Sequence, residues 1–506
     1  MKYWFAAFIL LVLVIVSIKL FTGEVNTAKF NKTYEAEDGI LNGVKVSQNI
    51  TGYSGNGYVT DFNKKNDSVT FKIHVPSKGL YILHIGYQIP TGSGKKYTKL
   101  ILNDASPKKI LLPESNEFTE IPGERVLLDQ GENTIKFASD WGYYNLDYIK
   151  VQSASALTAH NVSKKLVNPN ATKETKALMS FLVDNYGKRI LSGQQDISEV
   201  KWLNKNIGKK PAIVGFDFMD YSPSRVTYGI KSNQTEQAIQ WDKEGGIVTF
   251  SWHWNAPKDL IDTPEKKWRG FYKDGTTFDI GYAMNHPESE DYQLILRDID
   301  TIALQLKKLQ KAKVPVIFRP LHEAEGSWFW WGAKGPEPAK QLYRLMYDRL
   351  TNYHKINNLI WVWNSVSKDW YPGDEYVDIV SYDSYPAPGD YSSVSSPYDR
   401  LVSLVNNQKI VALSENGPIP SPDLLKEYQI HWSWFLTWES KFLRGGKINS
   451  LEHLNKVYHN PYVITLDELP NLKTYGKANN STRFSEFWNA LKRVLIFTSS
   501  GSVLDI

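Results

Sequence analysis

The chain has 506 residues, more than one ordinary domain requires, and its 42% of hydrophobic residues suffice for substantial cores, so we expect two domains. Basic residues number 59 against 54 acidic ones, a net charge of +5 without a long basic run, which argues against nucleic acid as a partner. The lack of cysteine excludes disulfides, thiol nucleophiles and lipid attachment through cysteine.

The chain opens with Lys2 and an apolar run over residues 3–16. At roughly 14 to 16 residues, this run suits the apolar region of a signal peptide better than a spanning helix, which needs about 20. We predict that residues 1–22 are a signal peptide, with an uncleaved N-terminal anchor as the alternative. The protein is then expected to be secreted, without stable membrane association once the signal is removed.

Residues 30–153 contain short segments in which apolar and polar residues alternate, such as SVTFKIHV, LYILHIGY and NTIKFAS, separated by Gly, Pro and Asn turns. Alternation with a period of two residues is typical of antiparallel strands that bury one face. We therefore predict an antiparallel β-sandwich of the jelly-roll type as the first domain.

Three motifs in this domain, TYEAEDG at 33–39, GYSGNGYV at 52–59 and WGYYNLDYIKV at 141–151, resemble a family 35 carbohydrate-binding module. The resemblance implies a structural calcium ion that joins the first strand to the last, and its matching oxygen ligands are Glu35, Glu37 and Asp147. On one strand, Glu35 and Glu37 project to the same side, as shared ligation requires. The alternative is a solvated acidic edge.

The same resemblance implies a sugar-contacting aromatic in the loop before the last strand, where Trp141 stands, with Tyr53 and Asn145 as weaker companions. A buried structural tryptophan is the alternative. Tethering a sugar-binding module to an enzyme raises the effective concentration of the enzyme at an insoluble polymer.

Residues 154–172 are small and polar with little periodicity, which predicts an exposed linker. Over residues 173–498, strand-like runs alternate with helical patterns such as 291–311 and 338–355. The runs are RILSG, AIVGFDF, GIVTFSW, PVIFRPL, LIWVWN, VDIVSYDSY, KIVALSE and HWSWFLTW. Eight runs predict an α/β fold, a (β/α)8 TIM barrel, with its active site at the C-terminal ends of the strands.

A candidate general acid follows the apolar run PVIF at 315–318, because Glu323 precedes four aromatics in the segment SWFWWG. Aromatic surroundings partly desolvate a carboxyl group and raise its pKa. A zinc site of the HExxH type is excluded because Gly326 occupies the position of the second histidine. The alternative is that Glu323 only forms an ion pair with Arg319.

A second carboxyl group ends another strand-like run, because Glu415 follows KIVALS and precedes the turn residues NGP. Carboxyl groups on two strand ends face each other across a barrel mouth. A retaining glycosidase needs such a pair about 5 to 5.5 Å apart, one as acid/base and one as nucleophile.

Four motifs, LSGQQD at 191–196, FSWHWNAP at 250–257, RPLHEAEGSWFWWG at 319–332 and LSENGP at 413–418, together resemble glycoside hydrolase family 26. Most members of that family are endo-β-1,4-mannanases. The resemblance implies retaining hydrolysis of internal β-mannosidic linkages in mannan, glucomannan or galactomannan by double displacement, with no cofactor for catalysis.

Matched residue by residue, Glu323 corresponds to the family's acid/base and Glu415 to its nucleophile. Further matches are expected to support the acids or contact the sugar, and they are His253, Arg319, His322, Trp328, Tyr385 and Trp438. Tyr382 is the alternative to Tyr385 as the tyrosine that hydrogen-bonds the nucleophile. The family often has Met and Asn after the acid/base, whereas this chain has Ala324 and Glu325.

The strand runs predict which residues converge on one rim of the barrel, since C-terminal strand ends meet there. The residues at or near such ends are Asp217, His253, Glu323, Asn364, Tyr385, Glu415 and Trp438. His253 stands between Trp252 and Trp254 and is the favoured active-site histidine. Asp217 and Asn364 are weaker candidates, because each also suits a helix cap.

Two alternatives to a mannanase remain at the level of sequence. The first alternative is an enzyme of the same mechanism that acts on a β-glucan or xylan, since fold and carboxylates do not identify the sugar at each subsite. Otherwise the chain is a noncatalytic carbohydrate-binding protein, against which two acids at strand ends argue. We expect a monomer whose partner is a β-mannan-type polysaccharide.

Overall fold

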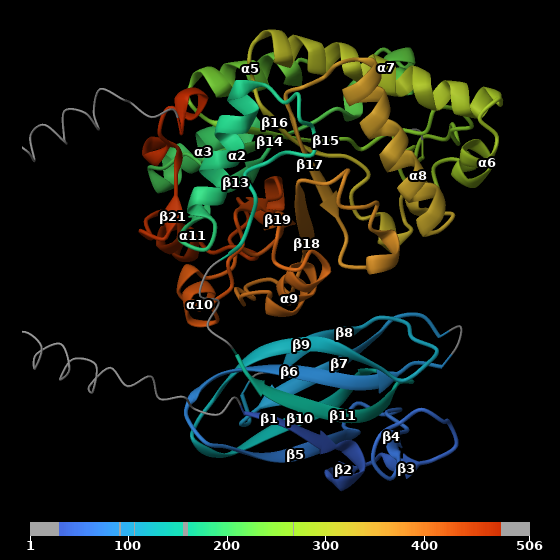
Figure 1. Cartoon of the computed structure of the whole chain (residues 1–506), viewed down its shortest axis with the longest axis vertical. Coiled ribbons are helices and arrows are strands. Elements are labelled where there is room, and N and C mark those ends of the chain that lie inside the picture. Colours follow the sequence, from blue (N-terminus) through green and yellow to red (C-terminus); the bar gives the residue numbers. More distant parts are fainter. Residues whose placement is uncertain (1–29, 91–92, 106, 155–159, 267, 477–506) are drawn as a thin grey trace, which may run out of the picture. The chain divides into compact units, whose positions relative to one another are not determined.

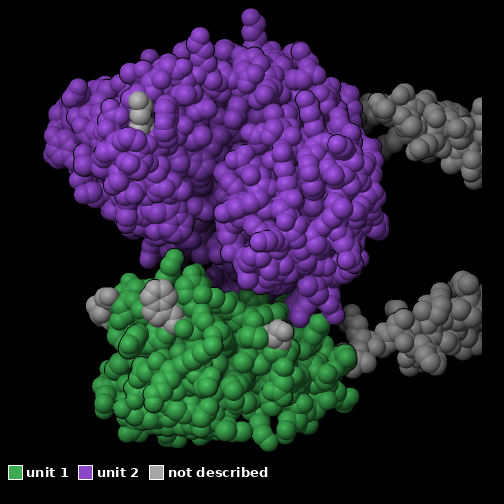
Figure 2. Space-filling model, turned by 180° about the vertical axis from the view of Figure 1, so that it is seen from behind, with its two compact units in different colours: residues 1–156 green, residues 157–506 purple. Residues whose placement is uncertain are grey.

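The computed structural model describes residues 30–90, 93–105, 107–154, 160–266 and 268–476. The predicted signal segment 1–22 therefore lies outside the described residues, as do 155–159 of the predicted linker and the part of the predicted enzyme domain beyond residue 476. The chain separates into two compact units, Met1–Ala156 and Leu157–Ile506, which Figure 2 colours green and purple. Among the described residues, no helix is both long and apolar enough to cross a membrane.

The N-terminal unit contains two antiparallel sheets, which confirms the predicted sandwich (Figure 1). One sheet has the order β3 (Lys45–Ser47), β4 (Tyr58–Thr60), β11 (Asn145–Ser153), β6 (Gly79–Gln88) and β9 (Thr119–Leu128), and β1 (Asn31–Glu35) also pairs with β11. The other has the order β2 (Ile40–Asn42), β5 (Ser68–Val75), β10 (Gly131–Trp141), β7 (Lys96–Leu102) and β8 (Lys108–Leu112).

Alternation along β5 explains how the sandwich acquires its core. Val69, Phe71 and Ile73 are buried, whereas Lys72 and His74 between and beside them are exposed. Because successive side chains of a strand point to opposite faces, the buried set faces the second sheet. The unit therefore has a hydrophobic core of its own.

Two sequence expectations for this unit were wrong in their local structure. Trp141 is the last residue of β10, paired with Tyr97, and does not lie in a loop. Glu35 ends β1, but Glu37 belongs to the 3-10 turn η1 (Ala36–Asp38), so the two glutamates do not share a strand. Burial of Ala36 turns the chain inward at this point, where an extended strand would have continued.

The C-terminal unit is a closed barrel of parallel strands, and this confirms the predicted fold (Figure 1). In barrel order its strands are β13 (Gly193–Gln195), β14 (Ile213–Asp217), β15 (Ile247–Ser251), β16 (Val316–Arg319), β17 (Leu359–Asn364), β18 (Ile379–Ser384), β19 (Ile410–Asn416) and β20 (Phe435–Thr437). Strands such as β15 and β17 are buried along their whole length, because the barrel interior covers one face and helices cover the other.

Helices surround the barrel, and their bounds are α2 (Lys173–Asn185), α3 (Ile197–Ile207), α4 (Pro223–Thr227), α5 (Gln234–Lys243), α6 (Ile280–Asn285), α7 (Glu290–Lys311), α8 (Pro336–Tyr347), α9 (Ser395–Leu404), α10 (Pro422–Glu427) and α11 (Leu451–Tyr458). The helix expected over 291–311 is α7. The pattern over 338–355 divides into α8 and a π-helical turn, Asp348–Tyr353. In the first predicted run, Ile190–Leu191 pairs with β21 (Val463–Ile464) outside the barrel, and the barrel strand begins at Gly193.

The described part of the segment before α2 is tied to the barrel unit. The backbone N–H of Val167 donates to Oδ1 of Asp378 (2.7 Å), and the side chain of Thr172 caps α2. Nε2 of His160 lies 2.7 Å from Nδ1 of His431. Residues 160–172 therefore lie against the barrel unit as a packed segment.

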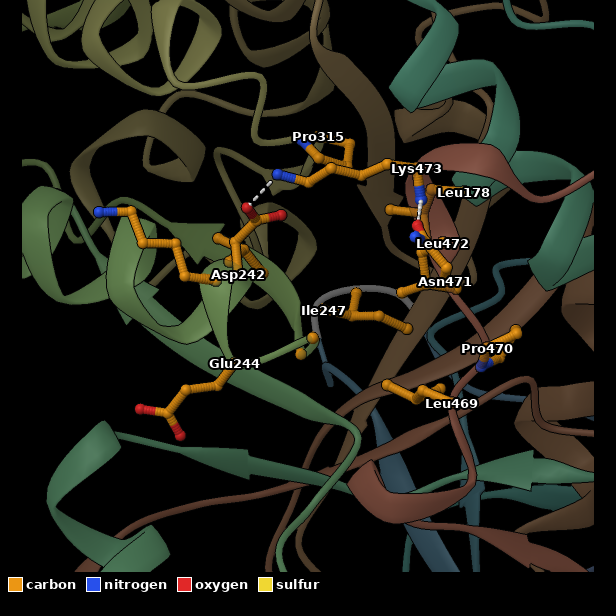
Figure 3. Close-up of a pocket in the computed structure, with 14 residues that line it drawn as sticks. Leu178, Asp242, Glu244, Ile247, Pro315, Leu469, Pro470, Asn471, Leu472 and Lys473 are labelled. Carbon is orange, nitrogen blue, oxygen red and sulfur yellow. Dashed lines mark hydrogen bonds and ion pairs between the residues drawn. The ribbon is translucent and has the colours of Figure 1, made fainter.

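The amino end of the barrel carries a hollow of about 430 Å³ beside the starts of β15 and β16 (Figure 3). The segment Leu469–Lys473 lines it, and Nζ of Lys473 forms an ion pair with Asp242 of α5 at 2.5 Å. Since catalytic groups of such barrels lie at the carboxyl ends of the strands, we assign this hollow a structural role.

Candidate active site

Glu415 lies inside β19, a strand whose seven residues are all buried. Nη2 of Arg319 donates to its Oε2 (2.6 Å), and the hydroxyl of Tyr385 donates to its Oε1 (2.5 Å). Both carboxylate oxygens thus accept hydrogen bonds from β16 and from the residue after β18. A charged donor and a hydroxyl on one carboxylate stabilise its ionised form, as a nucleophile requires.

Arg319 ends β16, is 3% exposed, and connects two acids. Its Nη1 donates to Oδ2 of Asp383 (2.5 Å), while its Nη2 holds Glu415. Among the described residues, Arg319 has no ion pair with Glu323, so the alternative of a simple Arg319–Glu323 pair is not observed.

Asp383 is the site residue that the sequence reasoning missed. Oδ1 of Asp383 accepts from Nδ2 of Asn364 (3.0 Å) and from Oγ of Ser414 (2.8 Å). The signal was present, because Asp383 precedes Tyr385 by two residues in the run VDIVSYDSY and therefore shares its side of the strand.

Glu323 lies on a turn four residues beyond the end of β16. Its backbone is left-handed (φ 54°), as are those of Leu321 (φ 51°) and Ser327 (φ 55°), a conformation that costs energy for residues other than glycine. Oδ1 of Asn364 accepts from the backbone N–H of Glu323 (2.8 Å), and Nε1 of Trp328 donates to its Oε2 (3.0 Å). These bonds hold the strained turn on the end of β17.

The surroundings of Glu323 favour its neutral form. Burial, and then the negative charges of Asp383 and Glu415, raise the pKa of Glu323 to about 8, although Arg319 and Trp328 act in the opposite direction. A carboxyl group that is protonated near neutral pH is able to donate a proton to a departing oxygen.

The three carboxyl groups meet at the barrel mouth. Glu323, Asp383 and Glu415 each offer one oxygen, and these oxygens all lie within 4.8 Å of one another. Oxygens this close are compatible with the carboxyl pair about 5 to 5.5 Å apart that a retaining glycosidase needs.

A hydrogen-bonded series of three side chains lies beside the acids. Asp217, at the end of β14, accepts from the backbone N–H of His253 (3.0 Å) and from its Nδ1 (2.5 Å), and Nε2 of His253 lies 3.1 Å from Nε2 of His322. Burial lowers the pKa of His253, but the carboxylate of Asp217 outweighs it and raises that pKa. Burial, followed by the charges of Arg319 and His253, lowers the pKa of His322 well below its usual range. Of the two histidines, His253 is therefore the one whose charged form is favoured.

Aromatic side chains form a wall around this series. The ring of His253 lies edge-on to Phe271 (5.1 Å), Phe329 (5.8 Å) and Trp438 (5.9 Å). Trp328 is 37% exposed, which leaves much of its ring accessible beside Glu323. Stacking on accessible aromatic faces is a common way for proteins to hold sugar rings.

The loop after β15 is joined to the loop after β16 by backbone contacts. The backbone N–H of Lys273 donates to the carbonyl of Trp328 (2.8 Å), and that of Trp330 donates to the carbonyl of Phe271 (3.2 Å). Tyr272 and Phe329 form an antiparallel bridge between them. Phe271 and Tyr272 were not predicted as part of the site, because they lie far along the chain from any strand-like run.

The predicted metal ligands in the other unit all accept hydrogen bonds from the loop Ser54–Asn56, but their carboxylate oxygens are not all within 4.8 Å of one another. Backbone N–H of Ser54 donates to Asp147, the hydroxyl of Ser54 donates to Oε2 of Glu35 (2.6 Å), and backbone N–H of Asn56 donates to Oε1 of Glu37 (2.6 Å). Burial, together with the charges of Glu35 and Glu37, raises the pKa of Asp147 to about 7. The side chain of Trp141 lies outside what the structure describes.

Two family models match the chain. Glycosyl hydrolase family 26 matches residues 167–468, and carbohydrate binding module (family 35) matches residues 32–154.

Among curated proteins, the chain is 48% identical over 438 residues to a mannan endo-1,4-beta-mannosidase of Thermothelomyces thermophilus, covering 86% of this chain and 90% of that protein. It is 36% identical over 452 residues to mannan endo-1,4-beta-mannosidase A of a Piromyces species, covering 86% and 72%. Among solved structures, a Podospora anserina GH26-CBM35 β-(1,4)-mannanase is 45% identical with a TM-score of 0.65, covering 88% of this chain and 99% of that one.

Proposed function

The chain belongs to glycosyl hydrolase family 26 and is a retaining mannan endo-1,4-β-mannosidase, and from this premise we propose that Glu415 is its nucleophile and Glu323 its acid/base. The observation that carries the assignment is the contrast between the two groups. Glu415 receives an arginine and a tyrosine hydroxyl, while burial and neighbouring acids keep Glu323 protonated. Opposite environments assign opposite roles.

In the first step, a carboxylate oxygen of Glu415 forms a bond to the anomeric carbon of an internal mannosyl unit. The bond between that carbon and the glycosidic oxygen breaks, and the proton of Glu323 moves to the departing oxygen. The products are a shortened chain with a new hydroxyl group and a glycosyl ester of Glu415.

In the second step, Glu323 accepts a proton from water while the water oxygen bonds to the anomeric carbon and the ester bond to Glu415 breaks. Esterification removes the charge of Glu415, one of the causes that raise the pKa of Glu323. The pKa of Glu323 therefore falls when its carboxylate is needed as a base.

We assign the sugar contacts to the side chains that surround the acids. His253, Trp438 and Trp328 face the unit whose bond is cleaved and its neighbour, with His322 supporting His253. Tyr385 is assigned to the nucleophile, in preference to Tyr382, because its hydroxyl reaches Glu415.

Replacement of each acid tests the assignment. Glu415→Ala is expected to abolish hydrolysis of mannan in a folded protein, and azide is expected to restore cleavage of an activated aryl β-mannobioside with an α-glycosyl azide as the product. Glu323→Ala is expected to retain the first step on the activated substrate and to give a β-glycosyl azide. Substantial mannan hydrolysis by Glu415→Ala, or the same azide product from both variants, contradicts the roles.

We further propose that the N-terminal unit binds calcium through Glu35, Glu37 and Asp147. The fit rests on Oε2 of Glu37, which is buried without a hydrogen-bond partner, and on the crowding that raises the pKa of Asp147. Calcium ligands at about 2.3–2.6 Å from the ion lie up to about 5 Å apart, and an ion relieves repulsion among three acids.

We also propose that the N-terminal unit binds polysaccharide, with Trp141 as a contact, and that the protein is a secreted monomer. The match to a carbohydrate-binding module and the apolar run at 3–16 support these proposals. Edman sequencing of the native secreted protein tests the signal, because retention of residues 1–22 contradicts cleavage.

A further inference from the structure

The turn that carries Glu323 makes a second attachment to the barrel, through Glu325. Oε2 of Glu325 accepts from the hydroxyl of Ser365 (2.6 Å) and from the backbone N–H of Ser367 (3.1 Å). Its Oε1 lies 3.4 Å from the backbone N–H of Val366. Glu325 therefore binds the segment that follows β17, at the position where the chain departs from the family pattern.

The turn donates in one of its two attachments and accepts in the other. The backbone of Glu323 donates to the side chain of Asn364, the last residue of β17. The side chain of Glu325 accepts from the hydroxyl of Ser365 and from the backbone N–H groups of Val366 and Ser367. A single attachment would leave the turn free to rotate about one point, whereas two fix both its position and its orientation.

The turn has a strained backbone. Its backbone is left-handed at Leu321, Glu323 and Ser327, so surrounding contacts must hold it. The ring of Trp328 lies against Gly326, where an added Cβ would lie 2.1 Å from ring atoms. Glu325 adds a carboxylate, a stronger acceptor than a neutral group, to these contacts.

We infer that Glu325 is a positioning residue, which holds the carboxyl group of Glu323 where its proton reaches the departing oxygen. The inference rests on the proposed role of Glu323 as acid/base. A displacement of about 1 Å at a reacting group costs as much as 100-fold in rate, so loss of one attachment is expected to act on proton donation.

The first test compares Glu325→Gln on two substrates. The amide keeps the volume of the side chain but turns one acceptor into a donor that faces hydroxyl and N–H donors. We expect kcat on mannan to fall about tenfold with KM nearly unchanged, following the loss of geometry. The pre-steady-state burst on 2,4-dinitrophenyl β-mannobioside, whose departing group needs no proton, is expected to stay within about twofold.

Matched variants separate positioning from stability. Glu468→Gln removes a carboxylate that also accepts from a backbone N–H, that of Thr465, far along the chain from the acids, and it is expected to lower the melting temperature with equal effects on both substrates. Ser365→Ala removes the hydroxyl that donates to Glu325 at 2.6 Å. It is expected to lower kcat on mannan, but not the burst on the activated substrate, and by less than Glu325→Gln does.

The inference is overturned if Glu325→Gln and Ser365→Ala lower the rates on mannan and on the activated substrate equally. It is also overturned if neither variant lowers the rate on mannan. Glu323→Ala is measured in parallel. If the loss of rate in Glu323→Ala does not depend on the leaving group, the acid/base assignment fails. If the loss depends on the leaving group in Glu323→Ala but not in Glu325→Gln, only the role of Glu325 is removed.

Discussion

Asp383 sets the charge around both catalytic groups. It shares Arg319 with Glu415, and its negative charge is among the causes that raise the pKa of Glu323. The carboxylate of Asp383 thus anchors Arg319, which holds Glu415. The same charge opposes ionisation of Glu323. The position of this charge is expected to appear in the pH dependence of the enzyme.

Asp383→Asn tests that expectation. Glu323 acts protonated in the first step, so kcat/KM decreases as the pH rises through its pKa of about 8. Removal of the charge of Asp383 lowers that pKa, and the basic limb of the profile is expected to move to lower pH, together with a lower maximum because Arg319 loses a partner. The measurement is the pH profile of kcat/KM on soluble galactomannan. Asp300→Asn, on the outer helix α7, serves as the control, and an unmoved limb in Asp383→Asn contradicts the role.

At the scale of single residues, the sequence predicted the site residues that stand at the end of an apolar, strand-like run. Glu415, His253 and Arg319 follow or end apolar runs, and the structure brings them together. Asp383 was not predicted, because the run VDIVSYDSY holds several polar residues and the sequence does not show which of them meets Arg319. The partner of Arg319 was also hidden, since ion pairs between strands depend on register across the barrel.

At the scale of elements, close packing constrains the turn after β16. A Cβ at Gly332 would lie 2.1 Å from the carbonyl oxygen of Ala324 and 2.9 Å from its carbonyl carbon. Both contacts are with backbone, so a side chain there displaces the segment that carries Glu323. Glycine is therefore required for close approach of two backbone segments.

Gly332→Ala is expected to reduce kcat on mannan at least tenfold and to lower the free energy of unfolding by about 1–3 kcal/mol, as overpacking does. Steady-state kinetics and thermal melting check both values. Gly79→Ala is the control, because an added Cβ there has no neighbour within 4 Å. Wild-type kinetics in Gly332→Ala would show that the turn tolerates displacement.

Element types followed from periodicity, while several boundaries did not. The largely apolar runs of β15 and β17 predicted buried parallel strands, and the alternation in β5 predicted a half-buried one. The pattern over 338–355 does not reveal that the helix changes to a π-helical turn at Asp348, because apolar spacing is similar in both. Glu37 left its predicted strand because burial of Ala36 outweighed local preference.

For the whole molecule, two cores predict two units that unfold in separate transitions, and the proposed calcium ion would stabilise one of them. The N-terminal unit and the barrel each have a hydrophobic cluster of their own. The expected calcium ligands Glu35 and Asp147 come from β1 and β11, which pair directly. An ion between them crosslinks the first strand of the unit to the last.

Removal of calcium is expected to lower the melting temperature of one calorimetric transition and to leave hydrolysis of soluble mannan unchanged. The pKa of Asp147 is raised to about 7, so protons compete with the ion and the calcium effect is expected to weaken as the pH falls below that value. Asp147→Asn is expected to abolish the response to chelation by EDTA. Identical melting curves with and without EDTA would exclude the site.

The order of the two units along the chain and the class of each were predictable from the sequence, because strand alternation ends before the long apolar runs begin. The packed state of residues 160–172 was not. Their small polar side chains suggest a solvated linker, but Asp378 and Asn357 of the barrel offer acceptors that the sequence pattern does not reveal.

The two acids are anchored in different ways, and this affects how the enzyme can change. Glu415 belongs to a buried strand, so any mutation that moves it also disturbs the barrel and is removed by selection for folding. Glu323 lies on a turn beyond its strand, and apart from Asn364 at the end of β17 its supports belong to loop segments. Divergence among related enzymes, and libraries designed in the laboratory, are therefore expected to alter leaving-group preference through residues 324–328 and 365–367 while the nucleophile stays in place.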